Sequence, residues 1–456
     1  MKNEIAMKIF FAMLMAVLLG KSSIAQPFSQ SADRQPLREW SLEDCIQYAI
    51  LNNVQLNQSK LDLSIAENNL QQAKNNRLPV LAANTVQQHS TGRTIDPITS
   101  DFINTRLRST SLAAFANITL WNGGYLKNDI DKNKLILVQN QFFVDRAKND
   151  IVLTTIQAYM TALNLYEGIA IAEKTIANAL EQYRTAKGRH AVGTLSSIDL
   201  STYKAQLSTD TLTLINAENK YRSQVLQLKQ LLEIPPDSTF DIQKIALQEE
   251  MYPIPAAAEL YSEIKNHMPE TKLSRLDLHI KETELKLAKS GYYPKLSLRG
   301  GMTTGYTNTQ FFGFANQLQN NFSPNVSLDI TIPIFTQFTN RTNVKNAKLA
   351  IQRATLDIKK QDRELYSTLE SVIQEARSAH AQLNAARDAE QAAALSYQLA
   401  NRKNSLGALS LGEFIVIKNE YLNAADKYLQ AKLTFALYQK LISFYQTQTI
   451  TDQNER

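Results

Sequence analysis

One segment near residue 330 alternates apolar and polar residues with a period of two, which is typical of a β-strand whose faces meet different surroundings. On one face lie Val326, Leu328, Ile330, Ile332 and Ile334. On the other lie Asn325, Ser327, Asp329 and Thr331. Residues 111–120 alternate similarly, and partner strands are expected to start at Pro79 and Pro294. The sequence thus predicts strands at about 79–90, 109–121, 294–308 and 323–335, with 91–108 and 309–322 as hairpin loops.

Long helices are predicted where proline is absent, because a proline inside a helix costs about 3 kcal/mol. No proline occurs in 98–234 or 334–456, and both stretches are rich in good helix formers. Each has a glycine-containing break, at 187–196 and at 403–412. We therefore expect helices at about 125–187, 197–232, 338–405 and 411–447. The longer ones would reach about 90–100 Å, which favours a coiled coil or helical array over an ordinary globular domain.

The chain contains an internal duplication. When it is shifted by 215 residues, segment 61–81 lies over 276–296 with 10 of 21 positions identical. A period this long indicates a duplicated domain and not a solenoid. We expect a first repeat at 26–234, a linker at 235–270, a second repeat at 271–447 and a tail at 448–456. Each repeat would run helix, two strands, long helix, turn, helix.

The first 25 residues resemble a secretory signal peptide, with lysines before an apolar run and small residues before the expected cleavage after Ala25. That run, at 9–19, is too short to span a bilayer, and no later apolar stretch approaches 18 residues. A membrane span in the mature chain would therefore be a β-barrel. Four strands cannot close a barrel, so closure would require several copies, and three copies would supply twelve strands. The alternation alone is equally compatible with a soluble sheet packed on helices.

Composition excludes several functions. The formal net charge is +6, or +4 (46 basic minus 42 acidic residues) without residues 1–25, and no Lys/Arg run suggests nucleic-acid binding. The single cysteine, Cys45, rules out an internal disulfide and cysteine-rich metal sites, and we expect it to be buried on a helix. No metalloprotease, nucleophile-elbow or phosphate-loop motif is present, so neither an enzyme nor a cofactor is expected.

Several motifs together resemble the TolC-like outer-membrane efflux family. The segment WSLEDCIQYAILNNVQL at 40–56 looks like that family's first helix, and Leu78-Pro79 and LWNGG at 120–124 resemble its helix–strand and strand–helix steps. The breaks AVGTLSSIDL at 191–200 and SLGALSLGEF at 405–414 resemble its helical tips. The second repeat departs from the pattern with PIFTQ at 333–337, which lacks the glycines.

The resemblance implies a mainly α protein with a membrane β part. It would be a homotrimer with a 12-stranded β-barrel in the outer membrane and a 12-helix periplasmic tunnel, with 235–270 near its equator. Its expected partners are outer-membrane lipid, a periplasmic adaptor (membrane fusion) protein and an inner-membrane pump or ABC exporter, with no nucleic acid. It would be a passive duct of a tripartite efflux or type I secretion system in a Gram-negative cell. The exported substrate, whether drug, metal or protein, stays open.

The resemblance also suggests functional residues. At the tip it implies that Asp199 and Glu413 line the periplasmic entrance, although Ser196-x-x-Asp199 and Ser410-x-x-Glu413 are equally capping boxes. The tip turns and adaptor-docking residues would be Gly193, Leu195, Ser196, Gly407, Leu409 and Ser410. The tyrosine–arginine lock of some members has no obvious equivalent, and Asn404 and Leu409 stand in its place. On the strand, lipid would meet Val326, Leu328 and Ile330, and the lumen would meet Ser327, Asp329 and Thr331.

Two other functions compete with the channel. One is a secreted coiled-coil structural protein of the cell envelope without a pore, which heat-resistant trimers in the membrane fraction would argue against. The other is a periplasmic enzyme, for which the sequence offers no catalytic site.

Overall fold

The computed structural model describes residues 39–244 and 253–447. The expected signal peptide, the tail at 448–456 and part of the predicted linker lie outside these residues. The chain divides into two compact units, and each takes residues from both sequence repeats. The strand unit comprises 68–134 and 281–350, and the helical unit comprises the described parts of 35–67, 135–280 and 351–447.

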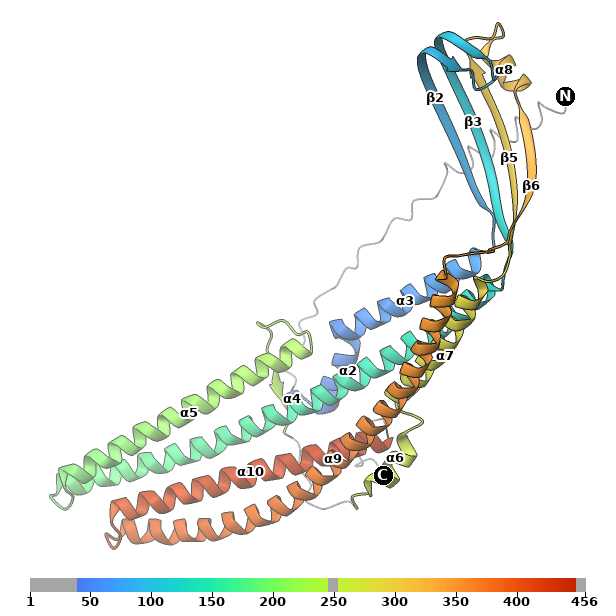
Figure 1. Cartoon of the computed structure of the whole chain (residues 1–456). Helices are drawn as coiled ribbons and strands as arrows, with labels where there is room; N and C mark the ends of the chain where they lie inside the picture. Colours follow the sequence, from blue (N-terminus) through green and yellow to red (C-terminus); the bar gives the residue numbers. More distant parts are fainter. Residues whose placement is uncertain (1–38, 245–252, 448–456) are drawn as a thin grey trace. The chain divides into compact units, whose positions relative to one another are not determined.

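The strand unit contains one antiparallel sheet of four strands in the order β2-β3-β5-β6 (Figure 1). The strands are β2 (Val80–Ile95), β3 (Phe102–Asn122), β5 (Lys295–Thr307) and β6 (Ser323–Thr331). Each repeat contributes one hairpin, and the pairing of β3 with β5 joins the two repeats. The four predicted strands are therefore present, and the outer edges of the sheet belong to β2 and β6.

The predicted hairpin loops were partly wrong. Most of 91–108 is strand, because β2 and β3 stay paired up to Ile95 opposite Phe102. Backbone pairing does not require an apolar pattern, so polar residues concealed this extension. The second loop contains the short helix α8 (Phe314–Asn320). Strand β6 ends at Thr331 although the alternation continues to Ile334, and the missing N–H of Pro333 agrees with that end.

Four long helices follow the proline-free stretches. They are α4 (Tyr125–Ala191), α5 (Ser197–Leu231), α9 (Thr339–Ser405) and α10 (Leu411–Thr447). Within the helical unit α4 packs beside α5, where the tilted rings of Tyr166 and Tyr221 are in contact, and α9 packs beside α10, where His380 contacts Phe435. The order helix, two strands, long helix, turn, helix is thus confirmed in each repeat.

The core of the helical unit gathers shorter helices around the long ones. These are α2 (Leu42–Asn52), α3 (Val54–Asn75) and α6 (Ala257–Ile264), and α7 (Pro269–Ser290) begins directly after the core residue Met268. Cys45 is fully buried here, as predicted, beside residues of α2, α4, α5, α6, α9 and α10. A two-stranded parallel sheet, β1 (Glu39–Trp40) with β4 (Asp241–Ile242), was not predicted. The Tyr159 hydroxyl lies 2.6 Å from the Gln243 carbonyl and 3.0 Å from that of Trp40, so it ties both strands of this sheet to α4 at one end.

The first helix of the sequence is two helices. The helix is interrupted at Asn53, whose side-chain oxygen accepts a hydrogen bond from the backbone N–H of Leu56 at 3.2 Å. Its amide group donates to the carbonyl of Leu231 at the end of α5, also at 3.2 Å. Asn53 therefore caps α3 and satisfies an open carbonyl of α5 at once, a tertiary contact that sequence periodicity does not reveal.

Candidate functional site at the helix turns and on the sheet

Both helical turns end their first helix in the same way. Gly193 and Gly407 have φ of +75° and +72°, a conformation that favours glycine. In each turn the next residue donates its N–H to a carbonyl five residues back, at 2.9 Å. This is the Schellman arrangement, which satisfies the last carbonyls of a helix. The turn role expected for both glycines is what the backbone shows.

The second helix of each turn begins with a serine cap. The Ser410 hydroxyl accepts from the Glu413 N–H at 3.3 Å, and the Glu413 carboxylate accepts from the Ser410 hydroxyl and backbone N–H at 2.7 and 3.3 Å. These hydrogen bonds lower the pKa of Glu413 below its usual value. At Ser196 the hydroxyl accepts from the Asp199 N–H at 3.0 Å and donates to its carboxylate at 2.8 Å. Ser196 and Ser410 therefore cap their helices, and Glu413 completes its capping box by accepting from the Ser410 N–H, while Asp199 bonds the Ser196 hydroxyl.

The two turns lie side by side within the helical unit. A Cβ built on Gly407 would lie 3.4 Å from a guanidinium nitrogen of Arg189, which belongs to the other turn. Nearby, the buried Tyr203 hydroxyl of α5 hydrogen-bonds the Asn404 side chain of α9, with its Oδ1 and Nδ2 at 3.3 and 3.1 Å. Asn404, which stands in the place of the tyrosine–arginine lock, thus has a phenol partner in Tyr203. Leu409 is half-buried in the turn itself.

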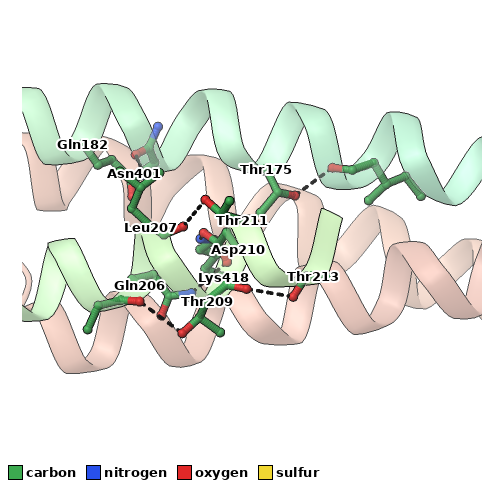
Figure 2. A network of polar contacts seen from close by, with 12 residues as sticks. Thr175, Gln182, Gln206, Leu207, Thr209, Asp210, Thr211, Thr213, Asn401 and Lys418 are labelled. Atoms are coloured by element: carbon green, nitrogen blue, oxygen red, sulfur yellow. Dashed lines mark hydrogen bonds and ion pairs between the residues drawn. The ribbon is translucent and has the colours of Figure 1, made fainter. Parts of the chain in front are cut away.

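A buried ion pair connects the two helical hairpins farther from the turns (Figure 2). The Lys418 ammonium of α10 lies 2.5 Å from a carboxylate oxygen of Asp210 on α5, and the two side chains are 2% and 7% exposed. The other oxygen of Asp210 accepts from the Gln206 amide at 2.9 Å. Sequence reasoning missed this pair. The internal repeat aligns Lys418 with Lys204, but Lys204 is exposed, so the alignment carries no sign of the burial.

The sheet has one polar and one apolar face along β5 and β6. Directly opposite residues share a face, and Arg299 stands opposite Ser327 while Ser297 stands opposite Asp329. The Arg299 guanidinium lies 4.0 Å from the Asp329 carboxylate. On the other face Leu298 stands opposite Leu328. The side chains of Val326, Leu328 and Ile330 are 78%, 58% and 62% exposed, so an apolar surface is open on this unit.

Neither a metal centre nor a helical membrane span is found among the described residues. Across 39–244 and 253–447, His, Cys, Asp and Glu side chains do not gather in threes where a metal could bind. Over the same ranges, no helix combines the length with the apolar character needed to cross a bilayer.

Comparisons with known proteins show which proteins are similar to this chain. The family model for outer membrane efflux protein matches residues 45–233 and 260–443. Outer membrane protein TolC of Salmonella enteritidis is 20% identical over 422 residues, covering 91% of this chain and 83% of that protein. TolC of Escherichia coli K12 is 21% identical over 413 residues, covering 88% and 80%.

Solved structures agree in fold. The crystal structure of CusC superposes with a TM-score of 0.74 at 17% identity, covering 93% of this chain and 99% of that one. The Campylobacter jejuni outer membrane channel CmeC gives 0.73 at 18% identity, covering 89% and 85%. Most of each repeat and both helical turns fall inside the matched family segments. The chain therefore belongs to the outer membrane efflux protein family.

Proposed function

We propose that this chain is one protomer of a homotrimeric, passive export duct, in which the four-stranded sheet forms one third of a β-barrel and the helical hairpins form part of a periplasmic tunnel. Membership of the family makes the protein an outer-membrane efflux channel. The trimer, the assignment of the two sheet faces and the roles of the tip residues are the parts proposed here.

The observation that carries the proposal is a sheet with unlike faces and two open edges. In lipid, unpaired backbone groups at a strand edge cost several kcal/mol each, so β2 and β6 require partners. The β6 edge of one copy can pair with the β2 edge of the next. Three copies then give twelve strands, an even number within the range of bacterial barrels. The nine residues of β6 match the length that a tilted transmembrane strand needs.

In such a barrel the two faces of the sheet would meet different surroundings. The exposed apolar side chains of Val326, Leu328 and Ile330 would meet lipid, and Ser327, Asp329 and Thr331 would meet a water-filled lumen. The Arg299–Asp329 pair supports this assignment, because a charged pair on a lipid-facing surface would be costly.

Channels of this family work with adaptor proteins and inner-membrane pumps. For this chain we propose that the two adjacent turns, with Gly193, Leu195, Ser196, Gly407, Leu409 and Ser410, bind a periplasmic adaptor, and that an inner-membrane pump or ABC exporter supplies the energy. Asp199 and Glu413 would add negative charge at the entrance besides accepting hydrogen bonds from the capping serines, Ser196 and Ser410. A structural coiled-coil protein without a pore is disfavoured by the family match.

Single-cysteine labelling tests the two faces. Cys45 is fully buried and burial raises its pKa to about 12, and its replacement by alanine leaves only the introduced thiol. In intact membranes Ile330→Cys should resist a water-soluble maleimide, while a fluorophore attached there after solubilisation and reconstitution should be quenched from the lipid phase. Asp329→Cys, one residue away, is the matched control and should react from water. Equal aqueous labelling of both positions, without quenching by lipid, would refute a membrane strand.

A further inference from the structure

The hairpin of β2 and β3 is longer than the sheet that it enters. Strand β3 pairs with β5 only from Ser109, which stands opposite Thr307, the last residue of β5. The seven residues from Phe102 to Arg108 pair with β2 alone. At about 3.4 Å per residue, a straight hairpin would carry its tip about 24 Å beyond Thr307.

The tip is nevertheless in contact with Thr307. Asp96 directly follows the last residue of β2, and its carboxylate accepts a hydrogen bond from the Thr307 hydroxyl at 2.9 Å. The same oxygen accepts from the Thr309 hydroxyl, in the loop of the other hairpin. The end of the β2–β3 hairpin therefore bends back over its own sheet, as the upper end of these strands does in Figure 1. We call residues 96–101 the strap.

The strap covers the polar face of the sheet. Along β5, Thr307 lies on the same face as Gly305 and Arg299, because alternate residues share a face. A Cβ built on Gly305 would lie 2.7 Å from the Thr110 carbonyl oxygen of the neighbouring strand and 2.8 Å from Cδ1 of Ile98, so the Ile98 side chain of the strap packs directly against this glycine. Leu107, Ser109 and Thr307, all on this face, are 1%, 2% and 0% exposed.

The Asp96 carboxylate holds the strap by accepting hydrogen bonds from four donors. Besides the two threonine hydroxyls, the backbone N–H groups of Ile98 and Thr99 donate to its other carboxylate oxygen, at 2.8 and 3.3 Å. Burial by itself would raise the pKa of Asp96, but these hydrogen bonds, that of Thr309 foremost, lower it below the usual value. The carboxylate is fully buried and ionised, and each bond to it is of the stronger, charge-assisted kind.

The residues beneath the strap are also held in place by hydrogen bonds. The side chain of Gln317 in α8 is fully buried, accepts from the Thr307 N–H at 2.8 Å and donates to the Thr307 carbonyl at 2.9 Å. Asn308 accepts from the Arg108 N–H at 2.6 Å and so continues the sheet past the end of β5. Both hairpins are therefore joined at one end of the sheet into a single folded cap.

We propose that the strap is a lid on the lumen side of the barrel, pinned by Asp96, which narrows the end of the channel formed by the β2–β3 and β5–β6 hairpins. The proposal rests on the channel function and on the assignment of the polar face to the lumen. In a trimer three straps, one from each protomer, lie at the same level around the axis. Release of Asp96 from Thr307 and Thr309 opens the lid without unfolding the strands below.

The first test reports on the strap itself and not on transport. In a Cys45→Ala background, the accessibility of Ile98→Cys to a bulky, water-soluble maleimide is followed in purified trimers. Asp96→Ala should accelerate labelling about tenfold or more, a factor that corresponds to about 1.4 kcal/mol. Asp101→Ala is the matched control, because it removes one carboxylate from the same strap, where that side chain is exposed. Thr309→Val, which deletes a single donor, should give a smaller increase and guards against failure of the alanine variant to insert.

The second test reports on the lid. In planar bilayers Asp96→Ala should raise the single-channel conductance above that of the parent protein, whereas Asp101→Ala, with the same loss of charge, should not. If Ile98→Cys is labelled at the same rate with and without Asp96, the proposal that Asp96 holds the strap is wrong. Faster labelling with unchanged conductance would overturn the lid. Absence of conductance in the parent protein would instead count against the channel, while the labelling would still report on the strap.

Discussion

The buried pair of Lys418 and Asp210 offers a sharp test of how the two helical hairpins are held together. Removal of one partner leaves a charge in a place where the side chains are only 2% and 7% exposed. Breaking a buried pair in this way typically costs about 3–5 kcal/mol, because the remaining ion is desolvated and unpaired. Lys418→Met keeps most of the volume of the side chain and removes its charge, so it isolates this effect.

The double variant separates charge from packing. Replacing both partners by apolar residues of similar size, Lys418→Met with Asp210→Leu, removes the pair and the stranded ion together. Such exchanges are often neutral or stabilising by about 1–4 kcal/mol. The Gln206 amide loses its acceptor in this variant, which offsets part of the gain. We therefore expect the double variant to be much more stable than Lys418→Met and close to the parent protein.

Lys204→Met is the matched control, since the internal repeat aligns Lys204 with Lys418 and its side chain is exposed. The assay is thermal unfolding of the detergent-solubilised trimer, followed by the helical circular dichroism signal at one heating rate, because unfolding of large assemblies is rarely reversible. The expected order of midpoints is Lys418→Met lowest, with the double variant, Lys204→Met and the parent close together. If the double variant unfolds as early as Lys418→Met, the reasoning about a stranded charge is wrong.

Two further predictions concern charge at the ends of the channel. Asp199→Asn with Glu413→Gln should weaken cation preference in bilayer conductance while the trimer stays folded, because both amides can still accept hydrogen bonds from Ser196 and Ser410. Unaltered selectivity would leave these residues a role at the helix starts alone. Hydrogen bonds lower the pKa of Asp96 in the folded protein. The stabilisation that ionised Asp96 gives to the folded strap is therefore complete above the usual aspartate pKa of 3.8, and it is lost as the pH falls through the lower pKa of the folded protein. Conductance should therefore rise in strong acid, and this rise should be missing in Asp96→Ala; a parallel rise in that variant would contradict the assignment.

Local rules predicted the main elements well. Proline-free stretches allowed helices of great length, glycines with positive φ ended them, and serine with an acidic residue three positions later began the next ones. Alternation predicted β3 and β6 and the two faces of β6, because a side-chain period of two depends on the backbone alone, and Pro79 and Pro294 located the starts of β2 and β5. The remaining features involve partners far apart in the chain. Asp96 meets Thr307 across 211 positions, and Lys418 meets Asp210 across 208.

The amino-acid sequence by itself determined the helices, the strands, their order and their duplication, since each depends on steric and hydrogen-bonding preferences of residues close together in the chain. Only the tertiary structure decided which residues that the duplication aligns differ in their burial and their partners. Lys418 is buried against Asp210 while Lys204 faces solvent, and Asn53 breaks one helix because it can reach the end of another. The bend of the strap over the polar face belongs here too, because it depends on Asp96 finding four donors that only the folded sheet assembles. Burial and long-range hydrogen bonds are properties of the assembled chain, so the same residue type acquires a different role at each of these places.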